Sequence, residues 1–170
     1  MAYPDEKRSG CSRVPAAMDE MIEVGGMVMV ICIFGESCTG KSTLAEALSG
    51  ELNAKIYTGK DYLRMDKDEA KARELFKRLL EEERETNLIY VVSEPEHLEL
   101  IPENSFRILA TCELGTIKNR FAQRMRGNLP DPVEKMIERK HGLFDKMEHH
   151  HHIHESSMNL PQLLDELKRH

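Results

Sequence analysis

The stretch Val28–Thr43, VMVICIFGESCTGKST, decides the fold. Its first part, Val28 to Phe34, is apolar throughout and mostly β-branched, which predicts a strand buried on both faces. The residues from Gly35 to Ser42 then match G-x-x-x-x-G-K-[ST], in which glycines let the backbone amides turn inward around an anion. The pattern after Lys41 is helical, so the N-terminus of a helix would point at bound phosphate. A strand, this loop and a helix in succession predict a nucleoside triphosphate site, against the alternative of a chance glycine-rich turn.

The residue types in this phosphate loop predict separate roles. Lys41 can reach the terminal phosphates and is the first candidate catalytic residue. The Ser42 hydroxyl can ligate Mg²⁺, and Thr43 is placed to help hold the α-phosphate. ATP and Mg²⁺ are therefore the expected cofactors. The residues expected to bind ATP are Gly35, Glu36, Ser37, Cys38, Thr39, Gly40, Lys41, Ser42 and Thr43.

Length and composition narrow the class of protein. A chain of 170 residues with 40% hydrophobic and 32% charged residues is typical of one globular domain. The net charge of −6 argues against a nucleic-acid partner. No apolar run approaches the ~20 residues of a membrane span, so we expect no membrane partner and a cytoplasmic location. The four cysteines lack metal-ligand spacing and are interpreted as unpaired: Cys11, Cys32, Cys38 and Cys112.

The rest of the chain alternates strand and helix patterns. Residues 1–26 are expected to be a flexible leader, and residues 27–170 a single nucleotide-binding domain. This alternation predicts a three-layer α/β fold, with a parallel sheet of about five strands, helices on both faces and ligands at the carboxyl ends of the strands. The expected later strands are 54–57, 88–92, 106–111 and 150–154, and the expected later helices begin near 66, 113, 132 and 160.

Four consecutive histidines, His149–His152, precede Ile153 and His154. Such a run is typical either of a purification tag or of a metal site. Adjacent residues on a strand point to opposite faces, which makes a shared zinc ion difficult. We interpret the run as the last strand and leave its affinity for metal open.

Other phosphate-loop classes are excluded by missing motifs, and a resemblance then emerges. The chain has no late N-K-x-D, as a GTPase needs, and no distant L-S-G-G, as a transporter ATPase needs. It resembles the nucleoside monophosphate kinases, especially the cytidylate-kinase-like and adenylate-kinase-like families. Besides the loop, the resemblance rests on YTGKDYLR at Tyr57–Arg64, similar to S-T-G-D-x-L-R, on the strand and helix at Phe106–Met125, and on the ending at Ile153–Leu167.

The resemblance implies transfer of the γ-phosphate of ATP to a nucleoside monophosphate. It also implies a short helical lid at about 118–140 whose arginines stabilise the moving phosphoryl group. Arg120 and Arg124, four residues apart on one helical face, are the expected catalytic pair, and Arg126 and Arg139 are expected to bind substrate. The alternative for these arginines is surface ion pairing.

Three residues are candidates for the acceptor side of the site. Asp61 could orient or deprotonate an acceptor hydroxyl, and Arg64 could clamp an acceptor phosphate. Glu94 could face the water shell of Mg²⁺ and contact substrate. The alternatives are a helix cap for Asp61 and a solvated turn for Glu94.

One departure keeps other functions open. Ser93–Glu96 reads SEPE where the family has D-G-x-P-R. The acceptor is therefore a small molecule, expected to be a nucleotide, with a nucleoside or another metabolite as the alternative. A nucleotide-binding regulatory module without transfer activity is a third hypothesis, and the oligomeric state stays open.

Overall fold

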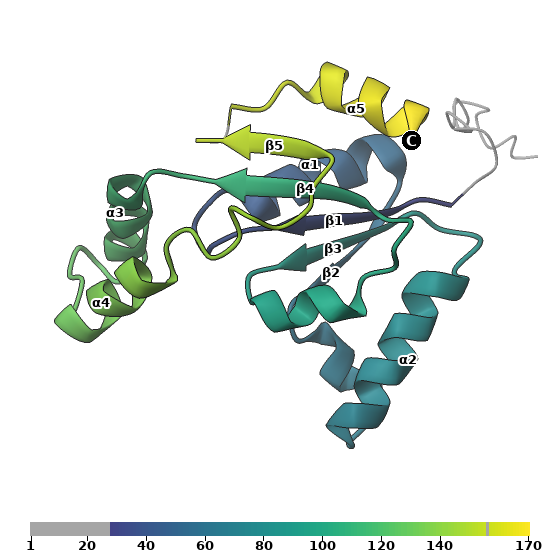
Figure 1. The fold of residues 1–170 in the computed structure, drawn as a ribbon, viewed down its shortest axis with the longest axis horizontal. Coiled ribbons are helices and arrows are strands. Elements are labelled where there is room, and N and C mark those ends of the chain that lie inside the picture. The colour runs from purple at the N-terminus through teal and green to yellow at the C-terminus, as the bar shows by residue number, and fades with distance from the viewer. Residues whose placement is uncertain (1–27, 156) are drawn as a thin grey trace, which may run out of the picture.

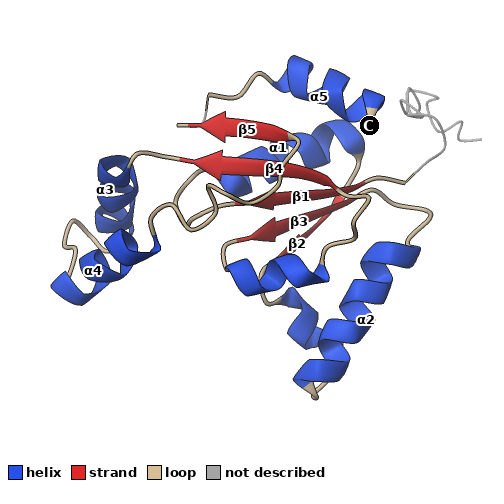
Figure 2. Cartoon of the chain, in the orientation of Figure 1, coloured by secondary structure: helices blue, strands red, loops and turns tan. Residues whose placement is uncertain are grey.

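The computed structural model describes residues 28–155 and 157–170, so the predicted leader at 1–26 lies outside the described residues. Strands and helices alternate along the chain (Figures 1 and 2). The strands are β1 (Val30–Phe34), β2 (Lys55–Thr58), β3 (Leu88–Val92), β4 (Phe106–Thr111) and β5 (His151–His154). The helices are α1 (Lys41–Leu52), α2 (Glu69–Glu82), α3 (Leu114–Arg124), α4 (Asp131–Lys140) and α5 (Leu160–Arg169), with short 3₁₀ helices η1 (Asp61–Arg64) and η2 (Pro95–Leu100).

The five strands form one parallel sheet in the order β2-β3-β1-β4-β5. Strand β1 is central, and its Ile33 lies beside Val91 of β3 and Ile108 of β4. Because all strands run the same way, their carboxyl ends share one edge of the sheet. The phosphate loop leaves β1 at that edge.

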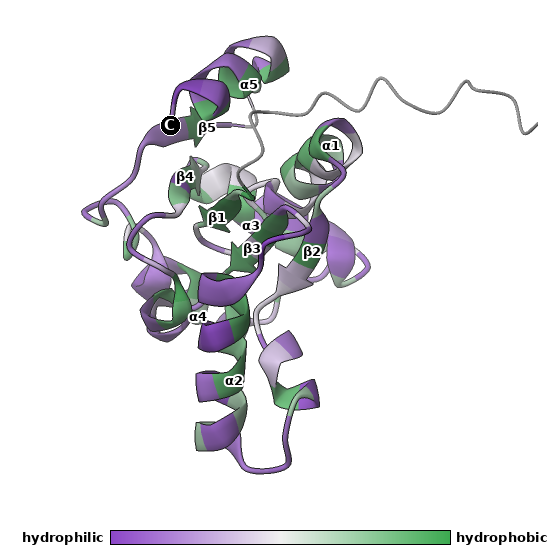
Figure 3. Ribbon diagram, turned by 90° about the vertical axis from the view of Figure 1, so that its right-hand side faces the viewer, coloured by the Kyte–Doolittle hydropathy of each residue, from purple (hydrophilic) through white to green (hydrophobic). Residues whose placement is uncertain are grey.

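Two cores cover the two faces of the sheet. On one face, Ile31 and Ile33 pack with Leu44 of α1 and Leu163 of α5. On the other, Cys32 and Phe34 pack with Phe76 of α2 and with residues of η1 and η2. Figure 3 shows the apolar strands between α1 and α5 on one side and α2 on the other. This alternation along β1 confirms the three-layer α/β fold predicted from its unbroken apolar run.

Most predicted elements are present, with small shifts at their ends. Strands β3 and β4 have the predicted bounds, and Asn159 caps α5 by accepting a hydrogen bond from the Gln162 amide over 3.2 Å. Helix α2 begins at Glu69 rather than near Asp66, because the Asp68 side chain caps it. The two 3₁₀ helices were not predicted, since single 3₁₀ turns carry no hydrophobic period.

Helices α3 and α4 form a hairpin, residues 114–140, beyond the carboxyl edge of the sheet (Figure 1). It occupies the place of the predicted lid. None of the helices that the structure describes is both long and apolar enough to cross a membrane.

Candidate active site

The phosphate loop requires glycine where it leaves β1. Gly35 has φ of +153°, and a Cβ atom there would lie 2.1 Å from the carbonyl oxygen of Ala110 in β4. Its amide donates to the carbonyl oxygen of Val92 in β3 over 3.2 Å. Any side chain at Gly35 would therefore push the loop away from the sheet.

Lys41, the first residue of α1, points back into the loop. It is buried, and its Nζ donates to the carbonyl oxygen of Glu36 over 2.5 Å and lies 3.4 Å from Thr39 Oγ1. Burial lowers the pKa of Lys41 to about 8, because the ammonium group has lost water. Gly40, at φ +89°, precedes α1 and offers no side-chain cap to its amides. An anion can therefore take the place of a cap.

A cavity of about 140 Å³, here called the phosphate cavity, lies over the loop. Among the described residues, the ionisable side chains that line it are the two cations Lys41 and Arg124 and the Cys38 thiol. Arg124 comes from the last turn of α3, so the hairpin contributes a cation to this cavity. The other lining residues are Ser37, Gly40, Ser42, Thr43, Val91 and Ser93.

Arg120 holds the outer side of the same loop. Its Nη1 donates to the carbonyl oxygen of Cys38 over 2.8 Å and lies 3.3 Å from Cys112 Sγ. Burial raises the pKa of the Cys112 thiol, so this contact is with the neutral thiol. Arg120 and Arg124 both line a further cavity of about 440 Å³ beside Thr43. The predicted pair thus lies on one helical face and meets the loop at two points.

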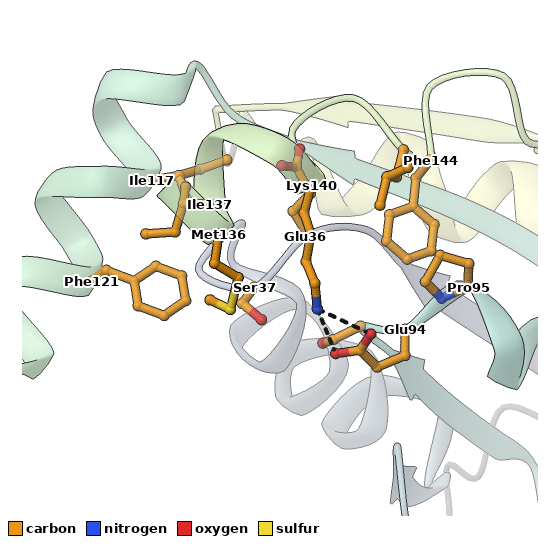
Figure 4. Close-up of a pocket in the computed structure, with 12 residues that line it drawn as sticks. Glu36, Ser37, Glu94, Pro95, Ile117, Phe121, Met136, Ile137, Lys140 and Phe144 are labelled. Atoms are coloured by element: carbon orange, nitrogen blue, oxygen red, sulfur yellow. Dashed lines mark hydrogen bonds and ion pairs between the residues drawn. The ribbon is translucent and has the colours of Figure 1, made fainter. Parts of the chain in front are cut away.

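A third cavity, of about 260 Å³, lies between the loop, the end of β3 and the hairpin (Figure 4). We call it the apolar cavity. Lys140 of α4 reaches across it, and its Nζ lies 3.3 Å from each carboxylate oxygen of Glu94. The other lining residues are Glu36, Ser37, Ser93, Pro95, Ile117, Phe121, Met136, Ile137, Leu143 and Phe144.

The phosphate cavity and the apolar cavity share two lining residues, Ser37 and Ser93. Ser37 belongs to the loop, and Ser93 directly follows β3. A molecule in the apolar cavity would therefore lie next to the phosphate cavity. This is the arrangement that a direct phosphoryl transfer needs.

Glu36 ties the loop to the segment that follows α4. Its Oε1 lies 3.1 Å from Nδ1 of His141, and its Oε2 accepts from the Gly142 amide at 3.4 Å. The Glu36 side chain is only 10% exposed. Its carboxylate thus points away from Glu94, as Figure 4 shows.

The predicted magnesium ligands occupy different places. Ser42 lines the phosphate cavity, where its exposed hydroxyl fits a Mg²⁺ ion held mainly by phosphates and water. Glu94 lines the apolar cavity instead and pairs with Lys140. The two residues do not line a common cavity among those described.

The predicted acceptor residues lie elsewhere. Asp61 accepts from the amide and the hydroxyl of Thr58, over 2.8 and 3.2 Å, and Arg64 is 86% exposed and 3.8 Å from Asp61. Neither lines any of the cavities described above, and the same is true of the exposed residues Arg126 and Arg139. The alternative for Asp61, a helix cap, is not observed either, because the residue preceding η1 is Lys60 and the Asp61 carboxylate accepts from Thr58 instead.

Sequence reasoning missed the importance of Lys140 and His141. Lys140 lies three residues after the buried Ile137 in α4, so the two residues share a helical face. A cation on an apolar stripe was the available signal, because such a position needs a partner or a ligand.

The histidine run forms β5 with alternating faces. His151 Nδ1 lies 2.6 Å from Glu166 of α5, whereas His152 and His154 contact the hydroxyl of Thr111 from the other face, at 2.7 and 2.9 Å. Within residues 28–155 and 157–170, no group of three or more His, Cys, Asp or Glu side chains is placed to hold a metal ion.

The comparisons place the fold among known proteins. No protein-family model matches the sequence, and no curated protein matches it significantly. A presumed kinase from Chloroflexus aurantiacus superposes with a TM-score of 0.59 at 14% identity, over 85% of this chain and 98% of that one. A gluconokinase from Sinorhizobium meliloti gives 0.52 at 12% identity, over 85% and 91%. A shikimate kinase from Bacteroides thetaiotaomicron gives 0.52 at 16% identity, over 83% and 95%.

The chain has the fold of the P-loop kinases. The likeness extends to sugar-acid and shikimate kinases, so it does not single out the nucleoside monophosphate kinases that the sequence resembles.

Proposed function

We propose that this protein is a phosphotransferase that moves the γ-phosphate of ATP to a small molecule. The observation that carries the proposal is the junction of the two cavities at Ser37 and Ser93. One cavity is lined by loop residues and cations, and the other is a separate, largely apolar space. A nucleotide-binding module without transfer activity would need only the first of them.

The residues of the phosphate cavity would divide the work on ATP. The loop amides and Lys41 would hold the β- and γ-phosphates, and Arg124 would stabilise charge on the transferred group. Arg120 would act indirectly, because its hydrogen bond to the Cys38 carbonyl oxygen would fix the shape of the loop. When bound at Ser42, Mg²⁺ would neutralise phosphate charge.

The sequence resemblance adds a nucleoside monophosphate as the specific acceptor, bound through Asp61 and Arg64. Since both residues lie outside the cavities described, support for this acceptor comes from the sequence pattern alone. The names of the similar structures give three further acceptor classes to test beside it, sugars, gluconate and shikimate.

The test has two steps, with Lys77→Ala on the exposed face of α2 as the matched control. Calorimetry should show that Lys41→Ala weakens ATP binding by at least about 100-fold, while the control binds normally. ADP formation is then measured with pooled nucleotides, nucleosides, alcohols, sugars and sugar acids. Unchanged ATP affinity in Lys41→Ala would refute the site. Lys41-dependent binding with no acceptor-dependent ADP would instead support the binding-module hypothesis.

A further inference from the structure

The phosphate cavity and the apolar cavity differ in the charged side chains that line them. The phosphate cavity has the cations Lys41 and Arg124, and the cavity beside Thr43 has Arg120 and Arg124. The charged side chains of the apolar cavity are two carboxylates and one ammonium group, those of Glu36, Glu94 and Lys140. Of the two carboxylates, that of Glu36 is turned toward His141 and Gly142, so Glu94 and Lys140 are the charged groups that meet in the cavity.

Among the described residues, the one cation that lines the apolar cavity is already paired. Lys140 Nζ lies 3.3 Å from both oxygens of Glu94, and the two side chains are 45% and 41% exposed. No arginine among the described residues lines this cavity. A phosphomonoester dianion there would lie beside the γ-phosphate and the Glu94 carboxylate, and the lysine that could compensate its charge is shared with Glu94. The cavity thus lacks what a phosphorylated acceptor requires.

The remaining surface suits an uncharged molecule. Residues from both helices of the hairpin, among them Ile117, Phe121 and Ile137, form one wall, and Pro95 and Phe144 lie opposite (Figure 4). Burying an apolar face between these walls is favourable, and aromatic rings present flat surfaces to a ring or chain. The Lys140–Glu94 pair crosses the space between the walls. Polar recognition is therefore confined to one side of the ligand.

We propose that the acceptor is an uncharged hydroxyl compound with an apolar face, and that Glu94 is its general base. This inference rests on the proposed function. The hydroxyl oxygen attacks the γ-phosphorus while its proton passes to the Glu94 carboxylate. The bond from the γ-phosphorus to the β–γ bridging oxygen breaks, and its electron pair leaves with ADP. Lys140 orients the carboxylate and neutralises charge on the moving phosphoryl group.

The first test compares matched pairs of acceptors at saturating ATP. The probes are cytidine with CMP, thymidine with TMP, adenosine with AMP, ribose with ribose 5-phosphate, and benzyl alcohol with benzyl phosphate. We expect the best substrate to be an uncharged member, with kcat/KM at least about tenfold above that of its phosphorylated partner. A preference for the phosphorylated members would overturn the inference while leaving the phosphotransferase function intact. Absence of ADP with every acceptor would contradict the proposed function itself, and this inference with it.

The second test changes the base and keeps its shape. Glu94→Gln should lower kcat by at least about 100-fold and leave the Kd for ATP within about twofold. Glu96→Gln, an exposed neighbour in η2, is the matched control and should retain full activity. Lys140→Met should lower kcat, whereas Lys135→Met on the exposed face of the same helix should not. Equal activity of Glu94→Gln and Glu96→Gln would overturn the role of Glu94.

Discussion

Arg120 Nη1 lies 2.8 Å from the carbonyl oxygen of Cys38, so a side chain of α3 fixes the turn of the phosphate loop from outside. Cys38 has φ of +65°, a left-handed conformation that is unfavourable for a residue with a side chain. The guanidinium therefore stabilises a strained loop, and the hairpin and the loop are coupled even without nucleotide.

Removing this contact should weaken nucleotide binding without direct loss of a phosphate ligand. A hydrogen bond from a charged group is worth about 1.5–3 kcal/mol, so Arg120→Ala should raise the Kd for ATP about 10- to 100-fold. Calorimetry measures the Kd for ATP, and Arg78→Ala, at an exposed position of α2, is the control. An ATP affinity equal to that of the control would show that the loop keeps its shape unaided.

Two arginines with different predicted roles should behave differently: the sequence predicts that Arg124 stabilises the moving phosphoryl group and that Arg64 clamps an acceptor phosphate. Arg124 lines the phosphate cavity, whereas Arg64 is 86% exposed and faces only Asp61. Arg124→Ala should raise the KM for ATP by about tenfold or more, through loss of a charge-assisted contact. Arg64→Ala should leave the KM of both substrates within about twofold. A large rise in acceptor KM on Arg64→Ala alone would restore a nucleoside monophosphate as the acceptor.

Lys41 contributes a dependence of stability on pH. Its pKa is about 8 when folded and 10.5 ordinarily, so between these values Lys41 binds more protons in the unfolded chain than in the folded protein. Its contribution to the free energy of unfolding should therefore rise with pH through this window, by about 1 to 2 kcal/mol between pH 7.5 and 9.5. The raised pKa of the Cys32 and Cys112 thiols acts in the opposite direction, so the contribution is read as the difference between a Lys41 variant and its control. Urea denaturation measures the rise. Lys41→Met should remove this rise, whereas Lys77→Met should retain it. Equal slopes of the free energy of unfolding against pH in the two variants would contradict the lowered pKa of Lys41.

The sequence predicted the fold well because its signals are local. The apolar runs of β3 and β4 and the Asn159 cap each lie within a few residues, and β1 with its loop identifies the central strand. The position of the phosphate site follows from the same stretch. These features depend on the chain near each residue and not on distant partners.

The acceptor side could not be predicted in this way, because it depends on contacts between distant segments. Lys140 meets Glu94 across 46 positions of sequence, and Arg120 meets Cys38 across 82. Asp61 follows a strand end, as a catalytic residue would, yet Thr58 takes up its carboxylate at short range. A local turn and a substrate contact have the same pattern in sequence, and only the three-dimensional arrangement separates them.

Gly35 provides the sharpest test of the geometry at the base of the loop. A Cβ atom there would lie 2.1 Å from the Ala110 carbonyl oxygen, which belongs to the backbone of β4 and cannot rotate away. The φ of +153° adds a conformational penalty. Gly35→Ala should therefore force β1 and β4 apart at their carboxyl ends and lower the free energy of unfolding by more than about 3 kcal/mol.

The matched control for this substitution is Gly50→Ala. Gly50 lies within α1 and is exposed, and a Cβ atom there meets nothing within 4 Å. Because alanine favours helix over glycine, this variant should gain up to about 1 kcal/mol in urea denaturation. The two substitutions add the same methyl group, so opposite signs would locate the cost at the contact with Ala110. A wild-type stability for Gly35→Ala would contradict the contact with the Ala110 carbonyl oxygen.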